Sequence, residues 1–316
     1  MSTGQGGRSF GVAFRRWRQT TGSILLFLSP VLFFVLVFLA FPLLSTVYLS
    51  MTDVQNNVFE RHHFIFLDGY IKTLTANDIY SQSFYKALEN QVYYVTSYFA
   101  FAFTLSLGVA LLLNELRRGN DFFQVVYCLP MIIPLSIVGG IFQWIFSGTT
   151  SGFTNIVMKA LGLIQRPYDL WQDYHLALFG LMIARAWKGA GFTIIIFLAG
   201  LKGIPRDVRE AAAIDGASRL QEAFHVSLPL LRPYLFIGGT WIIINSMKEY
   251  DLPSVVTRAG PGQATLTLYF WAWELGLGDY QQMGRAAQVA VIIALLIFVI
   301  IFVLNKFFKT EPAGRG

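Results

Sequence analysis

Six long apolar runs restrict what this sequence of 316 residues can fold into. A helix needs about 20 apolar residues to cross the hydrocarbon core of a bilayer, and the runs meet or approach that length. They lie near residues 24–49, 91–113, 122–146, 175–199, 234–250 and 286–308. Only 13% of the residues are charged, against about 25% in soluble domains. The pattern predicts an all-α, polytopic membrane protein with six transmembrane helices.

The lysines and arginines predict how these helices are oriented. With the N-terminus inside, fourteen of them fall in cytoplasmic segments, six in external segments and four within spans or at their edges. Cytoplasmic loops of membrane proteins carry the excess of basic residues. Both termini are therefore predicted in the cytoplasm, and membrane topology explains the net charge of +6 more simply than nucleic-acid binding does.

The predicted topology divides the chain into four parts. Residues 1–22 form a cytoplasmic tail, and residues 23–87 hold the first span, which is too long for a signal peptide, with an external loop. Residues 88–308 form the core, with a polar cytoplasmic loop at 202–231, and residues 309–316 form a second tail. In the third span, Pro130 and Pro134 lie one turn apart and predict a kink.

The polar loop at 202–231 begins with the signals of a short helix and an elbow. Pro205 suits the first turn of a helix, where its missing N–H costs nothing. Residues 207–213, which include three alanines, propagate a helix well. Asp215-Gly216 predicts a break, because glycine tolerates the left-handed conformation that ends a helix.

A second short helix is predicted directly after the elbow. Ser218 and Gln221 have the spacing of a capping box, and Pro229 is expected to close this helix. Two short helices at a fixed angle outside the membrane form a compact knob. The alanine side chains let another protein approach it closely.

The same loop carries a resemblance to a known family. The pattern Glu210-Ala211-Ala212, then Gly216, then Leu228-Pro229 resembles the cytoplasmic coupling loop of binding-protein-dependent ABC importer permeases. Within that family it leans toward the carbohydrate-uptake branch, the maltose and glycerol-phosphate type. A second segment, Thr257 to Pro261, is similar to the external Thr-x-Gly-Gly-Pro segment of sugar permeases, with Ala259 where the first glycine is usual.

The resemblance implies the fold of a type I ABC importer permease and a set of partners. Two copies of a separate ABC ATPase subunit are expected at the cytoplasmic face, where they bind ATP and Mg. A second, homologous permease and an extracytoplasmic solute-binding protein are expected as well, in the inner membrane of a bacterium or archaeon. The residues implied in coupling to the ATPase are Glu210, Ala211, Ala212, Asp215, Gly216, Ala217, Leu228 and Pro229. The binding protein is expected to dock on the loops 51–89, 147–174 and 251–284.

Motifs for enzyme chemistry are missing from the sequence. It has no Gly-x-x-x-x-Gly-Lys-Ser/Thr loop for ATP, no His-Glu-x-x-His helix and no spaced Cys/His cluster for a metal. The adjacent His62 and His63 would not share one face of a helix. The single cysteine, Cys128, lies in an apolar run and excludes an internal disulfide. We therefore expect no catalytic residue, no metal site and no cofactor in this chain.

Polar residues inside the spans are candidates for the substrate pathway, because they are costly in a membrane. Trp241, Asn245 and Lys248 or Glu249 recur at helical spacing in the fifth span, followed by Tyr250. An aromatic plate with an amide and a charge suits a sugar; the alternative is that this face packs against other helices. Arg185 and Lys188 share a face in the fourth span. Three interpretations of these two cations stay open: they contact an anionic substrate, they line a water-filled cavity, or they pair with carboxylates of a partner permease.

These patterns predict one permease subunit of an ATP-driven importer, moving a sugar or oligosaccharide by alternating access. One alternative within transport is a permease for a phosphorylated polyol, a peptide or another solute. Another class is a membrane-embedded transferase, which predicts acidic or histidine clusters at one membrane face. A secondary transporter predicts midplane carboxylates for ion coupling, and these spans are poor in aspartate and glutamate.

Overall fold

The computed structural model describes residues 24–308, apart from residue 25 and the segments 57–61 and 117–118. The predicted tails at 1–22 and 309–316 lie outside the described residues. The described part is helical, with one isolated β-bridge between Thr52 and Phe64. Its elements are η1 (Leu36–Ala40), α2 (Phe41–Ser50), α3 (Asp68–Thr75), α4 (Ile79–Glu115), α5 (Asn120–Ile132), α6 (Leu135–Ile145), α7 (Phe153–Ala160), η2 (Leu170–Gln172), α8 (Ala177–Lys202), α9 (Arg206–Ile214), α10 (Arg219–Glu222), η3 (Ala223–Ser227), α11 (Leu228–Met247), η4 (Pro253–Thr257), α12 (Leu268–Gly276) and α13 (Met283–Phe308).

Five continuous helices of the described chain are long and apolar enough to cross a membrane, and the number is six if one bent pair of helices is counted as a single broken span. This confirms the predicted all-α membrane architecture. The five helices are Leu26–Ser50, Ile79–Glu115, Ala177–Lys202, Arg219–Met247 and Met283–Phe308, and the bent pair is Phe122–Ile132 with Leu135–Ile145.

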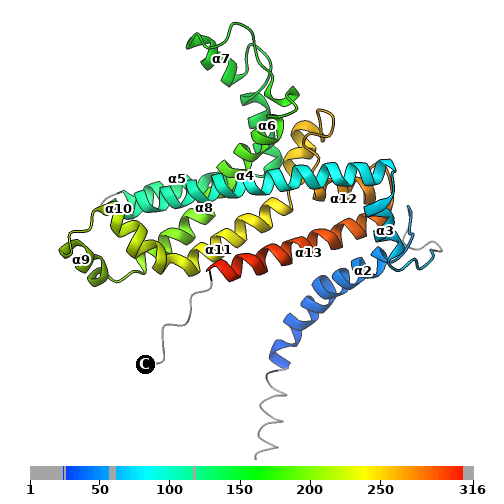
Figure 1. Cartoon of the computed structure of the whole chain (residues 1–316), viewed down its shortest axis with the longest axis horizontal. Coiled ribbons are helices and arrows are strands. Elements are labelled where there is room, and N and C mark those ends of the chain that lie inside the picture. Colours follow the sequence, from blue (N-terminus) through cyan, green and yellow to red (C-terminus); the bar gives the residue numbers. More distant parts are fainter. Residues whose placement is uncertain (1–23, 25, 57–61, 117–118, 309–316) are drawn as a thin grey trace, which may run out of the picture.

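Helix α4 is the axis of the bundle. The Asp78 carboxylate caps its N-terminus by accepting the Ser81 N–H at 2.8 Å. From there 37 residues run along nearly the whole bundle, from α3 at one end to α10 at the other (Figure 1). A stripe at helical spacing is buried, and it packs along α8 because the stripe is apolar or small. Its members are Tyr94, Tyr98, Ala102, Ser106, Ala110 and Leu113.

Helices α11 and α13 complete the bundle beside α4 and α8 (Figure 1). Two of the three buried apolar clusters join α4 and α8 along the bundle, and the third joins α4, α11, α12 and α13. The core therefore extends along the spans instead of forming one compact centre.

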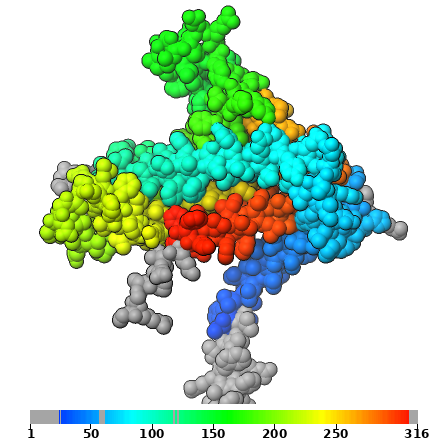
Figure 2. Space-filling model, in the orientation of Figure 1, coloured from blue at the N-terminus to red at the C-terminus, as the bar shows by residue number. Residues whose placement is uncertain are grey.

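The first span leans away from this bundle (Figures 1 and 2). None of its apolar window is buried, although its mean hydropathy is 2.6. It meets the other helices at the α3 end, where the Gln288 amide donates to the Ser50 carbonyl oxygen at 3.2 Å. Lipid tails and partner helices are the surroundings that suit such an apolar surface.

The third span is broken by its two prolines. Helix α5 ends at Ile132 and α6 begins at Leu135, and their axes differ in direction by 97°. Ile133 is extended, as expected for a residue before proline. The predicted kink is confirmed, and it is a full break. Helix α6 leads into an arm with α7 that projects from the side of the bundle (Figure 1).

The prediction that Pro229 closes a short second helix is wrong. Helix α10 passes through the π-turn η3 directly into α11, so Arg219–Met247 is one continuous span. In the π-turn the Leu228 N–H bonds back to the Ala223 carbonyl oxygen, and Pro229 falls in the first turn of α11. Proline is tolerated there because its missing N–H comes where the hydrogen-bond ladder has already shifted.

Candidate functional site

The elbow after α9 is locked by backbone hydrogen bonds. Gly216 has φ of +81°, the left-handed conformation. The Ala217 N–H donates to the Ala212 carbonyl oxygen at 3.0 Å, and the Gly216 N–H to that of Ala213 at 3.1 Å. This pair of bonds is the Schellman motif that ends helices. The predicted break at Gly216 is confirmed.

The second half of the elbow is locked by side chains. Ser218 and Gln221 form the predicted capping box, each side chain bonding to the other residue's backbone N–H. The elbow thus holds α9 and α10 at a set angle, because both of its sides are hydrogen-bonded.

The elbow presents an open surface at the end of the bundle. Glu210, Ala211, Asp215, Gly216 and Pro229 are exposed, and Ala212, Ala217 and Leu228 are half-buried. Three large apolar side chains beside them are also exposed: Ile214 at 86%, Leu220 at 72% and Phe224 at 63%. Exposed apolar side chains of this size, clustered beside a polar elbow at the end of the bundle, mark a protein contact surface.

A hollow of about 560 Å³ lies beside the elbow, lined by acidic and basic side chains. The Arg209 guanidinium crosses it, with Nη2 at 2.7 Å from Glu115 Oε1 and Nε at 2.8 Å from Glu222 Oε1. The hydrogen bonds that Arg209 donates to Glu222 and to Glu115 raise the pKa of Arg209 against the opposing effect of burial. The other residues that line the hollow are Arg206, Glu210, Ala213 and Arg219.

A second polar cluster lies inside the bundle, between α8 and the end of α11. Arg185 Nε lies 3.2 Å from Glu249 Oε2, and Arg185 Nη2 donates to Asn245 Oδ1 at 2.9 Å. The Tyr94 hydroxyl on α4 donates to the same Glu249 oxygen at 3.2 Å. Glu249 is only 2% exposed. A buried carboxylate requires such partners, because an isolated buried charge is very costly.

Lys188 lies one turn from Arg185 but has a different contact. Its ammonium group donates to the Met131 carbonyl oxygen at 2.8 Å, at the break between α5 and α6. Pro134 has no N–H, and the helix ends nearby, so carbonyl oxygens at this break need outside donors. Lys188 therefore helps to satisfy the broken span.

Trp241 faces an open part of the same region. Its side chain is 42% exposed, and its ring centroid lies 4.4 Å from that of Phe192. Lys248 is exposed, one turn beyond Asn245, whereas Tyr250 is half-buried among the rings of Tyr269, Phe270 and Trp273. Of the predicted pathway residues, the structure brings Arg185 into direct contact with Asn245 and Glu249 and leaves Trp241 and Lys248 accessible.

The sequence interpretation did not single out Tyr94, Glu115 or Glu222. Tyr94 had a detectable signal, because Gln91, Tyr94 and Tyr98 place polar groups at helical spacing in an apolar run. The sequence carries no signal for Glu115 or Glu222, because their partner Arg209 lies 94 residues from Glu115 and 13 residues from Glu222.

At the other end of the bundle, polar side chains of α4 hold the 257–267 segment. The Asn90 amide donates to the carbonyl oxygens of Gln263 and Leu266 at 2.7 and 2.9 Å. Gln91 accepts the Leu268 N–H and donates to the Ser246 carbonyl oxygen. Ala259, where the family pattern has glycine, has φ of +66°.

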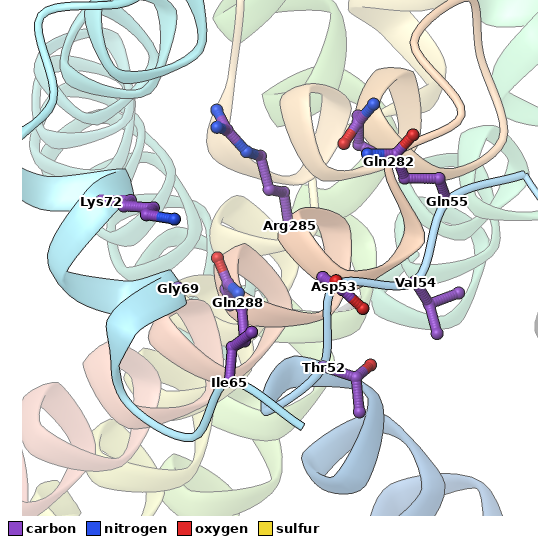
Figure 3. Close-up of a pocket in the computed structure, with 10 residues that line it drawn as sticks. All are labelled: Thr52, Asp53, Val54, Gln55, Ile65, Gly69, Lys72, Gln282, Arg285 and Gln288. Carbon is purple, nitrogen blue, oxygen red and sulfur yellow. The ribbon is translucent and has the colours of Figure 1, made fainter. Parts of the chain in front are cut away.

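A polar hollow of about 170 Å³ opens at this same end (Figure 3). It is lined by the residues after the first span, by α3 and by the start of α13, including Asp53, Lys72 and Arg285. Arg285 Nη1 pairs with Asp78 Oδ2 at 2.9 Å, and its guanidinium lies over the Tyr80 ring. The hollow thus lies between the segment 52–72 and the start of α13, which is far away in the sequence.

In the described part of the chain, no group of three or more His, Cys, Asp or Glu side chains is arranged to hold a metal ion. The elbow carries two ion pairs beside exposed apolar side chains, and the second polar cluster carries a buried ion pair.

These features define a polytopic helical bundle with an exposed, rigid elbow at one end and a buried ion pair near its broken span. Residues 100–310 match the family described as "Binding-protein-dependent transport system inner membrane component". The chain belongs to this family. The family predicted from Glu210-Ala211-Ala212, Gly216 and Leu228-Pro229 is therefore confirmed.

Two curated relatives and two solved structures are similar over nearly the whole chain. The trehalose/maltose transport system permease protein MalF of Thermococcus litoralis is 30% identical, covering 90% of this chain and 94% of its own. The arabinooligosaccharides transport system permease protein AraP of Bacillus subtilis is 28% identical, covering 90% and 89%.

The solved structures share the fold. A bacterial ABC transporter involved in import of the acidic polysaccharide alginate matches with a TM-score of 0.73 at 22% identity, over 93% of this chain and 98% of that chain. The alginate ABC transporter in complex with an alginate pentasaccharide-bound periplasmic protein matches with a TM-score of 0.77 at 19% identity, over 94% and 99%.

Proposed function

We propose that this chain is one permease subunit of an ATP-driven importer that moves a sugar or oligosaccharide across the cytoplasmic membrane of a bacterium or archaeon. The observation that carries the proposal is the rigid, exposed elbow between α9 and α10, which lies inside the family-matched region. The names of MalF and AraP, both for saccharide transport, support the substrate class.

The elbow is the proposed contact with a separate ATPase subunit, present in two copies that bind ATP and Mg. Exposed Ile214, Leu220 and Phe224 offer an apolar docking surface, and Glu210 offers a charge at its edge. When the two ATPase subunits close on ATP, they would push the rigid elbow, and this would favour one arrangement of the bundle over the other. Gly216 maintains the angle of the elbow, because glycine adopts the left-handed conformation at little conformational cost.

Two further partners belong to the proposal. A second, homologous permease is the proposed neighbour of the spans, and the unburied first span offers one apolar face for it. A solute-binding protein is proposed to dock on the predicted external loops 51–89, 147–174 and 251–284. The alginate transporter complex with its periplasmic protein supports this kind of partner.

The proposed substrate pathway passes Trp241. Its half-exposed ring can stack on the apolar face of a sugar, and the exposed Lys248 ammonium can bond to hydroxyl groups. Arg185 and Glu249 are occupied with each other, so their proposed role is to hold Asn245 at the edge of the pathway.

A purification from mild detergent tests the proposal directly. The tagged chain should recover an ATPase with a phosphate loop, a second permease of similar topology and a solute-binding protein. Recovery of the correctly inserted chain alone would overturn the importer assignment.

Transport by variants tests the two surfaces separately. Glu210→Lys and Gly216→Pro should abolish uptake while ATP hydrolysis continues. The first variant reverses the charge at the edge of the elbow, and the second removes its left-handed turn, because proline cannot adopt φ of +81°. Trp241→Ala should raise the substrate concentration needed for half-maximal uptake without dissociating the complex. Normal uptake in both elbow variants would remove the coupling role, and unchanged substrate dependence in Trp241→Ala would assign that ring to packing.

A further inference from the structure

Helix α9 has no buried residue. A helix normally stays in place because it buries an apolar face against its neighbours. The chain connects α9 to α8 through Gly203–Pro205 and to α10 through the elbow, but neither connection reaches α4. Some other contact must keep α9 in register with the long axis of the bundle.

Arg209 makes that contact. Its guanidinium binds Glu115, the last residue of α4, at 2.7 Å and Glu222, the last residue of α10, at 2.8 Å. Glu222 also accepts the Ser227 hydroxyl of η3 at 3.2 Å. The guanidinium therefore ties α9 to α4 and α10, and Glu222 extends the network to η3; the geometry of arginine suits it to hold two carboxylates at set positions.

Helix α4 is suited to carry movement onward from Glu115. It is one continuous helix of 37 residues that reaches the opposite end of the bundle (Figure 1). On the way, Tyr94 bonds to Glu249, Asn90 bonds to the 257–267 segment, and Gln91 bonds to Leu268 at the start of α12. A displacement of Glu115 along the helix axis would reach each of these contacts.

We propose that Arg209 is the joint that passes movement of α9 into α4. This rests on the proposed function, in which the ATPase pushes α9. The two ion pairs are half-exposed, with side-chain exposures of 31% for Arg209, 45% for Glu115 and 16% for Glu222. Such pairs contribute little to stability, so the role of Arg209 is to position α9 and not to hold the fold together.

The test uses the complete complex in proteoliposomes, with uptake and ATP hydrolysis measured together. Arg209→Gln and Glu115→Gln should lower the number of substrate molecules moved per ATP by at least about fivefold. Thermal stability should stay within about 2 °C of the parent. Arg232→Gln is the matched control, because Arg232 is exposed on α11 and has no ion pair among the described residues.

A cross-link distinguishes a joint from a simple charge effect. In a Cys128→Ser background, Glu115→Cys with Arg209→Cys should be uncoupled, and a short bis-maleimide that links the two positions should restore transport per ATP. A linked complex that stays uncoupled would show that α9 and α4 must move separately, which overturns the proposal.

The remaining outcomes separate this inference from the proposed function. If the parent chain recovers no ATPase, the proposed function itself fails. If the ATPase is recovered and Arg209→Gln and Glu115→Gln keep the parental transport per ATP, only the joint fails. If Arg209→Gln releases the ATPase from the complex, Arg209 is part of the docking surface, and the joint is again wrong.

Discussion

Gly191 on α8 lies against the carbonyl oxygen of Tyr127 on α5, so closely that a β-carbon at Gly191 would come within 2.3 Å of it. The next contact along α8 is the bond from Lys188 to Met131, one turn away. Together they press the last turn of α5 onto α8 just before the span breaks.

Gly191→Ala is expected to lower the free energy of unfolding by about 1–3 kcal/mol, because the clash is with backbone and α5 must shift. Gly108→Ala on α4 is the control, since nothing lies within 4 Å of its added β-carbon. It should be neutral or slightly stabilising. Thermal unfolding of the purified chain measures both, and an equal response of the two variants would contradict the close approach.

Glu249→Gln should lower the free energy of unfolding by about 3–5 kcal/mol, because it leaves the Arg185 guanidinium without its charge partner in a buried site. The double variant Arg185→Gln with Glu249→Gln should recover much of that loss. A double-mutant cycle on chemical unfolding gives the coupling between the two residues. Additive effects would mean that the two side chains do not interact.

Ala259→Gly should raise the free energy of unfolding by up to about 1 kcal/mol. Ala259 has φ of +66°, a conformation that costs an L-residue about 1–2 kcal/mol, and the greater freedom of glycine in the unfolded chain offsets part of the gain. Ala264→Gly in the same segment is the control, because Ala264 is buried and its φ is not positive. It should be destabilising, and a rise in both melting temperatures would refute this account.

Asp78→Asn should reduce the loss of stability in acid. Burial alone raises the pKa of Asp78, but the Ser81 amide and the Arg285 guanidinium outweigh it, so this pKa lies below its ordinary value of 3.8. The stabilisation from the ionised carboxylate is present above the unfolded pKa and is lost as pH falls through the lower, folded pKa.

Melting temperatures measured from pH 7 down to about pH 3 check this expectation. The parent should lose stability below about pH 4 more steeply than Asp78→Asn, which keeps a helix cap but has no titrating group. Parallel profiles for the two chains would mean that Asp78 does not contribute to the acid sensitivity.

The local signals of the elbow are sufficient to predict its form. Gly216 ends α9, and Ser218 with Gln221 begins α10, because both features depend on residues within five positions of one another. Pro229 led to a wrong prediction, because the π-turn before it lets the helix continue. The residue types in this segment do not indicate where the hydrogen-bond ladder shifts.

The contacts between distant residues could not be predicted in the same way. Arg185 and Lys188 share a face of α8 and were interpreted together, yet one pairs with Glu249 and the other with the broken span. The choice depends on which helix packs beside each side chain. In the sequence, Arg209 likewise cannot be told from an ordinary exposed arginine. Only the fold places Glu115 of α4 and Glu222 of α10 beside it.

Residue types and their near neighbours are enough to predict the membrane class, the kink at Pro130 and Pro134 and the elbow at Gly216, because apolar run length, missing N–H groups and positive φ depend on the local sequence. Only the tertiary structure decided the partners of Arg185, Lys188 and Arg209, the exposure of the first span and the 97° turn into the arm. These depend on how helices distant in the sequence pack, and many packings satisfy the same apolar pattern.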